Sequence, residues 1–169
     1  MGSDRKPVHG PVVIRGATER DLPALVDLTI AFYEEDDFAA VPGPVLEARL
    51  SRFLSQADAN VAVAVESDVT VGFALTTMRL ILESGLVAEL QDLYVVPDYR
   101  GLGVGSALVT NAAQWAKDGS ATTLEVVIAP NGRDVSHLDR YYASLGFEDE
   151  RRRLVHLDLE RRARPRSRP

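Results

Sequence analysis

The chain has 169 residues, of which 46% are hydrophobic and 26% charged, a composition typical of one soluble globular domain. It contains no cysteine, which excludes disulfides, thiol catalysis and thiolate metal sites, and its three histidines lack metal-ligand spacing, so no metal is expected. No apolar run approaches the roughly 20 residues that span a bilayer, and the first residues lack the apolar core of a signal peptide. We therefore expect a cytoplasmic protein without membrane contact.

Acidic and basic residues are unevenly distributed along the chain. All 25 Asp and Glu residues precede position 161, whereas the last nine residues hold five of the 19 Lys and Arg residues. An acidic body argues against nucleic-acid binding, because phosphate contacts need basic surface. We expect a disordered leader at 1–10, a single domain at 11–160 and a basic, disordered tail at 161–169, for which contact with an anionic surface is the alternative.

The first half of the chain predicts a strand, two helices and two further strands. Thr18, with Asp21 three residues later, has the pattern of a capping box at the start of the first helix, and apolar residues follow at helical spacing. A Pro-Gly-Pro break precedes the second helix. In chain order, we expect a strand at 12–15, helices at 17–37 and 41–56, and strands at 60–67 and 70–82.

The second half predicts alternating strands and helices. Pro97 ends the first strand of this half, and Gly146 ends the last helix. The element order β-α-α-β-β-β-α-β-α-β predicts a three-layer α/β body with a mixed sheet, in which the strands flanking the middle helix are parallel. We expect strands at 87–96, 122–129 and 152–159, and helices at about 103–117 and 134–146.

Three glycines, Gly101, Gly103 and Gly105, stand between Arg100 and the third helix. The first N–H groups of a helix lack intrahelical partners, and a phosphate can approach them closely where side chains are absent. The run lacks the Gly-Lys-Ser/Thr of a Walker loop, and Leu108 stands where a dinucleotide-binding fingerprint needs glycine. The run therefore favours a phosphate site, with a loose turn entering a helix as the alternative.

Two stretches resemble signatures of the GCN5-related N-acetyltransferase (GNAT) superfamily. "ELQDLYVVPDYRGLGVGSAL" resembles its central motif, Arg/Gln-x-x-Gly-x-Gly/Ala, and "RYYASLGF" its aromatic-Tyr-x-x-x-Gly-Phe motif. The resemblance covers about 12–159 and is locally strongest to the spermidine/spermine acetyltransferase branch. It implies an α/β (α+β) three-layer fold, whose mixed, mostly antiparallel sheet is splayed between the strands at about 87–96 and 122–129.

The resemblance implies acetyl-coenzyme A as the cosubstrate. Its diphosphate would lie on the amides of the glycine loop, and its pantetheine arm would run beside the preceding strand, where an N–H near Val95 would polarise the acetyl carbonyl. The resemblance also implies that Asn131, which follows the strand at 122–129, contacts the pantetheine. The implied cofactor-binding residues are Leu93, Tyr94, Val95, Arg100, Gly101, Leu102, Gly103, Val104, Gly105, Ser106 and Asn131.

Acetyl transfer to an amine needs a group that accepts a proton from nitrogen and a group that protonates the leaving thiol. The resemblance implies Tyr142 as the acid, with an aromatic ring that only packs as the alternative. Glu89 has the spacing of the base in histone-type members, whereas polyamine-type members carry a carboxylate at the position of Gln91. Strand alternation predicts Glu89 and Gln91 on one face and Asp92 on the other. Because glutamine cannot accept the proton, we expect Glu89 as the base, with a water chain as the base and a mere surface carboxylate as the alternatives.

Four consecutive acids at 34–37 could attract a cationic amine, although a solvated helix end is the alternative. We expect an acetyl-coenzyme A-dependent N-acetyltransferase that moves an acetyl group to a primary amine by direct attack, with a small-molecule amine as acceptor. A peptide or protein acceptor, a non-catalytic acyl-coenzyme A-binding module and a generic phosphate-binding domain are the alternatives. Analogy with the family suggests a homodimer.

Overall fold

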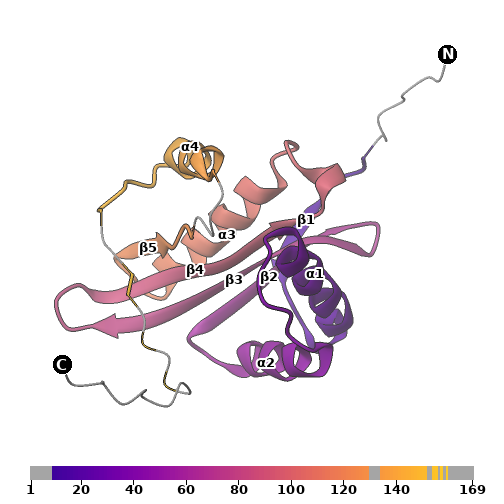
Figure 1. Cartoon of the computed structure of the whole chain (residues 1–169), viewed down its shortest axis with the longest axis horizontal. Helices are drawn as coiled ribbons and strands as arrows, with labels where there is room; N and C mark the ends of the chain where they lie inside the picture. Colours follow the sequence, from indigo (N-terminus) through magenta and orange to yellow (C-terminus); the bar gives the residue numbers. More distant parts are fainter. Residues whose placement is uncertain (1–8, 130–133, 152–153, 156, 158, 160–169) are drawn as a thin grey trace, which may run out of the picture.

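A computed structural model describes residues 9–129, 134–151, 154, 155, 157 and 159 of the chain. Their strands form one sheet with helices on both faces (Figure 1). The predicted tail at 161–169 and most of the predicted leader lie outside the described residues, so the domain boundaries stay predictions. Within the described residues, none of the helices has both the length and the apolar character needed to cross a membrane.

The sheet is mixed and mostly antiparallel, as predicted. Its strand order is β1-β2-β3-β4-β5, in which the first four strands pair antiparallel and β5 pairs parallel to β4 across the α3 crossover. The strands are β1 Val13–Gly16, β2 Ala59–Glu66, β3 Val69–Ile81, β4 Gly85–Val95 and β5 Thr123–Val126.

Helices cover the two faces of the sheet around two apolar cores (Figure 1). Alternate residues of β2 serve different cores, because successive side chains of a strand point to opposite faces. Val61 and Val63 pack toward the first two helices, and Ala62 and Ala64 toward the last two. The helices are α1 Leu22–Glu35, α2 Gly43–Ser55, α3 Val104–Asp118 and α4 Ser136–Ser144, with 3-10 turns η1 Glu19–Asp21 and η2 Pro97–Tyr99.

The predicted closing strand at 152–159 is wrong for its described residues. Leu154, Val155, Leu157 and Leu159 are at least 77% exposed and belong to no strand. Alternation of apolar and polar residues specifies two faces but supplies no hydrogen-bonding neighbour, and a strand requires one. The other positions of this segment lie outside the described residues.

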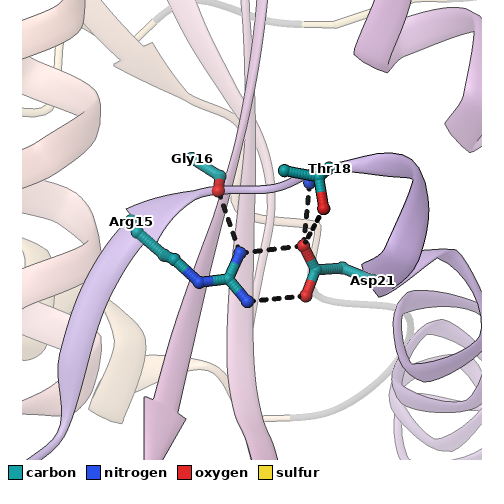
Figure 2. A network of polar contacts seen from close by, with 4 residues as sticks. All are labelled: Arg15, Gly16, Thr18 and Asp21. Carbon is teal, nitrogen blue, oxygen red and sulfur yellow. Dashed lines mark hydrogen bonds and ion pairs between the residues drawn. The ribbon is translucent and has the colours of Figure 1, made fainter. Parts of the chain in front are cut away.

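The predicted capping box forms, but it caps the start of η1, and α1 begins directly after η1 at Leu22. Asp21 accepts hydrogen bonds from the Thr18 N–H at 2.8 Å and from its hydroxyl at 3.0 Å. Arg15 donates two further hydrogen bonds of 2.8 Å to the same carboxylate (Figure 2). Asp21 is 7% exposed, so this network fixes the end of β1 to the start of α1 inside the fold.

We expect Asp21→Asn to lower the free energy of unfolding by about 2 kcal/mol at pH 7, because it breaks a partly buried charged network. Hydrogen bonds from Arg15 hold the pKa of Asp21 well below its usual range. The carboxylate therefore stabilises the fold fully above about pH 4, the ordinary unfolded pKa, and this contribution is lost as the pH falls below it. Urea titrations at pH 7 and pH 3 should show a smaller difference from the wild type at pH 3. Asp27→Asn, at an exposed α1 position, is the control, and a pH-independent difference would contradict the expectation.

Candidate functional site

The parallel pair of strands separates part-way along β4. Pairing with β5 covers only Val87–Leu90 and Thr123–Val126, and β4 then continues to Val95 without a β5 partner. This confirms the predicted splay between the two strands. The separation leaves one edge of β4 open in the middle of the sheet.

Backbone groups of β4 face this open edge. The Val96 N–H donates to the Val71 carbonyl of β3 at 3.0 Å. Because successive residues of a strand alternate in direction, the N–H and C=O of Val95 point to the opposite side, away from β3. The Val95 carbonyl there accepts a 2.7 Å hydrogen bond from Nε of Arg100. This edge can therefore receive an extended ligand as an added strand.

A cavity of about 830 Å³ opens where the strands part. Its wall combines the open end of β4 with aromatic and acidic residues from the end of α1 and with the start of α4. The described lining residues are Phe32, Tyr33, Glu35, Asp36, Phe38, Ala39, Leu90, Gln91, Asp92, Leu93, Tyr94, Val95, Arg100, Val126, Val127, Ile128, Ala129, Asp134, Val135, His137, Leu138 and Tyr142.

The glycine loop presents backbone amides at the start of α3. Gly101 and Gly103 have φ angles of 73° and 84°, in the left-handed region that favours glycine, and a Cβ at either would meet nothing within 4 Å. Gly103 is the N-cap, and as a glycine it has no side chain to accept hydrogen bonds from the first N–H groups of α3. The Ala107 N–H donates to the Gly103 carbonyl at 3.0 Å. The N–H groups that precede Ala107 therefore lie at an open helix terminus that suits a phosphate.

A buried hydroxyl lies beside this loop. A Cβ at Gly105 would stand 2.9 Å from Oη of Tyr141, and within the described part of the chain this oxygen is buried without a hydrogen-bond partner. The Tyr141 ring packs against the Tyr142 ring, with 5.1 Å between the ring centres. The sequence does not predict a role for the Tyr141 hydroxyl, because the family signature requires only an aromatic residue at this position. An unpaired donor next to open amides fits the diphosphate of a coenzyme A.

Arg100, one of the expected cofactor-binding residues, has its guanidinium bound to other residues of the chain. Its guanidinium donates to both oxygens of Glu35 at 2.6 and 2.7 Å and lies 5.3 Å from the centre of the Tyr94 ring. Its backbone N–H donates to the Pro97 carbonyl at 3.1 Å. Arg100 therefore joins the end of α1 to β4, and its charge is balanced by Glu35.

Tyr142 lies at the cavity wall with its ring in the core. It is 8% exposed and packs against Phe147 at 5.3 Å. Burial raises the pKa of Tyr142 to about 12, so the phenol stays protonated at neutral pH. The side chain is thus a proton donor that faces the same cavity as the open edge of β4.

Glu89 lies away from the cavity lining. Its carboxylate accepts a hydrogen bond from Arg79, whose second nitrogen donates to Glu125 of β5 at 2.7 Å. Glu89 is not among the described residues that line the cavity. Its role as the base stays a prediction, in a place where an arginine already holds the carboxylate.

A bulge in β4 changes the predicted faces. Thr76 pairs with Leu90 and Leu75 pairs with Asp92, so Gln91 is an extra residue in β4. Asp92 therefore lies opposite Leu75, whose core contacts are with α1 and α2, and the prediction that it occupies a different face from Gln91 is wrong. The Gln91 side chain donates a hydrogen bond of 2.8 Å to the hydroxyl of Thr77. Thr77 is two residues after Leu75 in β3, so Gln91 and Asp92 both lie on the face of Leu75. The sequence signal is the adjacent polar pair at 91–92, which interrupts the alternation.

Asp92 is the carboxylate that the bulge brings into the cavity wall. Burial raises its pKa to about 6, and no hydrogen bond or ion pair holds it within the described part of the chain. A buried carboxylate with a raised pKa in a cavity is a candidate for acid–base chemistry.

Comparison with known proteins decides the family. Residues 22–147 match the model of the acetyltransferase (GNAT) family. The chain belongs to this family. An uncharacterized N-acetyltransferase of Archaeoglobus fulgidus is 30% identical to this GNAT chain over 78% of its length and 89% of that protein.

Other GNAT relatives match over smaller shares. An aminoglycoside N(6')-acetyltransferase of Stenotrophomonas maltophilia is 33% identical over 66% of this chain and 71% of that protein. An uncharacterized N-acetyltransferase of Methanocaldococcus jannaschii is 32% identical over 47% of this chain, but the match spans only 35% of that protein. The predicted GNAT membership and N-acetyltransferase class are confirmed.

Solved structures confirm the GNAT fold. An integron cassette protein from a salt-marsh metagenome superposes with a TM-score of 0.76 at 28% identity, covering 86% of this chain and 90% of that one. The aminoglycoside N-acetyltransferase AAC(6')-Iy, solved in complex with CoA, has a TM-score of 0.77 at 18% identity and covers 90% and 98%. This second likeness is one of fold alone.

The GNAT fold brings most of the predicted site residues together. Leu93 to Val95 line the cavity, and Gly101 to Ser106 form the loop and first turn of α3. Leu102 is exposed, whereas the Val104 side chain is buried, which leaves its N–H as the group available to a ligand. Asn131 lies outside the described residues.

Proposed function

We propose that this GNAT protein transfers the acetyl group of acetyl-coenzyme A to the primary amine of a small cationic molecule. One observation carries the proposal: the open edge of β4 leads directly into an uncapped helix N-terminus. Coenzyme A has an extended amide-bearing arm joined to a diphosphate. The open edge of β4 suits the arm, and the helix N-terminus that follows suits the diphosphate. The CoA complex of AAC(6')-Iy, a protein with the same fold, supports this choice.

Residues of this chain would hold the cosubstrate in three places. The amides from Gly101 to Ser106 would bind the diphosphate, and Leu93 to Val95 would pair with the pantetheine arm. The Val95 N–H, at the open edge, would stabilise charge that develops on the acetyl oxygen. Tyr142 would protonate the departing sulfur. The bound thioester supplies the activated acetyl group.

The acceptor side of the cavity suits a cation. The rings of Phe32, Tyr33 and Phe38 pack together at 5.4–5.8 Å between centres, and Glu35 and Asp36 lie beside them in the wall. Ring faces attract an ammonium group. Glu35 is paired with Arg100, so the ring cluster and the acids beside Glu35 are the groups proposed to attract it. The name of the Stenotrophomonas relative, an aminoglycoside acetyltransferase, supports a small-molecule amine over a protein lysine.

Calorimetric titration with acetyl-coenzyme A, coenzyme A and ATP tests the cosubstrate. We expect binding of the first two and none of ATP. Release of free thiol is then measured with polyamines, aminoglycosides and lysine peptides. Thiol release with small amines supports the proposal; release with peptides alone favours a protein acceptor, and tight binding without release indicates a binding module. A cytoplasmic location and a homodimer stay predictions.

A further inference from the structure

We propose that Asp92 is the base that takes the proton from the acceptor amine, an inference that rests on the proposed function. The spacing of the family motif favours Glu89 for this role, but Glu89 is outside the described cavity lining, whereas Asp92 lines the cavity together with Tyr94 and Val95. Its carboxylate is thus on the same wall as the N–H expected to face the acetyl group.

The surroundings of Asp92 leave its carboxylate available. Glu89 is engaged by Arg79, whereas no described residue donates a hydrogen bond to Asp92. Tyr33 of α1 lines the same cavity; burial raises the pKa of Tyr33, and the charge of Asp92 adds to that shift. An unpaired carboxylate in a partly buried position costs folding free energy, so its retention in a cavity suits a function better than a structural role.

The balanced reaction needs no other co-reactant. Asp92 takes one proton from the acceptor ammonium, and the freed lone pair forms the N–C bond as the C–S bond breaks. The sulfur receives a proton from Tyr142, and the nitrogen gives up its second proton, which returns the phenol to its neutral form. Asp92 then releases its proton to water, so that amide, thiol and one proton are the products. No group changes oxidation state.

Other titratable and charged groups face the same cavity as Asp92. Those on its wall are Tyr33, Glu35 and Asp36 at α1, Arg100 before α3, and Asp134 and His137 at α4. Burial alone accounts for the raised pKa of Asp92, so these charges leave its titration near pH 6. His137 lines the same cavity and its imidazole can accept a proton, so it must be tested separately.

The pH dependence of kcat/KM for the amine, at saturating acetyl-coenzyme A, tests the role. With the base in place, the rate should fall tenfold per unit below about pH 6 and be level above it, because the enzyme removes the proton itself. Asp92→Asn must instead use the amine that is already neutral in solution. Its rate should be about 2000-fold lower at pH 7, close to the neutral fraction of the amine, and should rise tenfold per unit toward the amine pKa of about 10.4.

Three further variants make the comparison specific. His137→Gln should keep the level region, and Asp27→Asn, at an exposed α1 position, should match the wild type. If Glu89 were the base, Glu89→Gln would instead show the kcat/KM that rises with pH. Asp92→Asn should also retain its affinity for acetyl-coenzyme A and melt no lower than the wild type; Asp92→Ala serves if the first variant does not fold.

The outcomes separate this inference from the proposed function. A rising profile in Asp92→Asn and not in Glu89→Gln or His137→Gln supports the inference. A level profile in an active Asp92→Asn, or the rising profile in Glu89→Gln, overturns it while acetyl transfer stands. Absence of thiol release by the wild type with every amine overturns the proposed function and this inference together.

Discussion

Replacing Gly103 with asparagine should weaken the binding of acetyl-coenzyme A about 100-fold in a protein that still folds, the loss of one or two charge-assisted hydrogen bonds. Gly103 has a φ angle of 84°, and asparagine is among the few other residues that tolerate this conformation. No atom lies within 4 Å of the Cβ that asparagine adds, so the protein itself offers no clash. The new side chain instead occupies the space in front of the open amides of α3.

Calorimetry with acetyl-coenzyme A measures this effect, and a second glycine provides a matched control. Gly85, at the start of β4, has a φ angle of 76° and equally open surroundings, but it stands at the opposite end of the strand from the glycine loop. Gly85→Asn therefore carries the same backbone cost without obstructing the loop, and its affinity should equal that of the wild type. Unchanged affinity in Gly103→Asn would argue against a diphosphate on these amides.

The parts of this site that the sequence predicts are those that local chemistry determines. The glycine loop can be predicted from the sequence because a phosphate site at a helix N-terminus needs several residues without side chains directly before the helix. The order of strands and helices up to α4 follows from periodicity, and the splay follows from the family resemblance. In the same way, Tyr142 is located by a motif at the end of a single helix.

Contacts between distant segments escape the sequence. Glu35 and Arg100 are 65 positions apart, and nothing local indicates that one carboxylate neutralises the arginine expected at the diphosphate. Arg79 similarly reaches Glu89 and Glu125 on two other strands. Such pairs depend on strand register, which is set by packing across the whole sheet.

The bulge in β4 shows how one register shift alters a functional assignment. A strict two-residue period places Asp92 on the face opposite Glu89 and Gln91. Because Gln91 is one extra residue, Asp92 lies on the same face as Glu89, and it lines the cavity where β4 separates from β5. Bulges commonly occur beside active sites because they re-aim a side chain in this way. A polar pair inside a predicted strand is therefore a reason to consider both residues.

Replacing Tyr142 with phenylalanine should lower kcat between about 100-fold and 1000-fold and leave the affinity for acetyl-coenzyme A nearly unchanged, because only the proton donor is removed. With a pKa of about 12, the phenol is protonated throughout the usual assay range. A thiol has a pKa of about 8.5, so full transfer of the proton to a free thiolate is unfavourable, and donation must accompany the breaking of the C–S bond. The loss of kcat should therefore be the same from pH 7 to pH 9.

Tyr141 offers the matched comparison for this prediction, because the same change at the adjacent position removes a hydroxyl beside Gly105. Tyr141→Phe should weaken acetyl-coenzyme A binding roughly fivefold, the value of one hydrogen bond, and affect kcat much less. Steady-state rates and calorimetry on both variants separate the two hydroxyls. A turnover of Tyr142→Phe equal to that of the wild type would remove the acid role, and the departing thiolate would then take its proton from water.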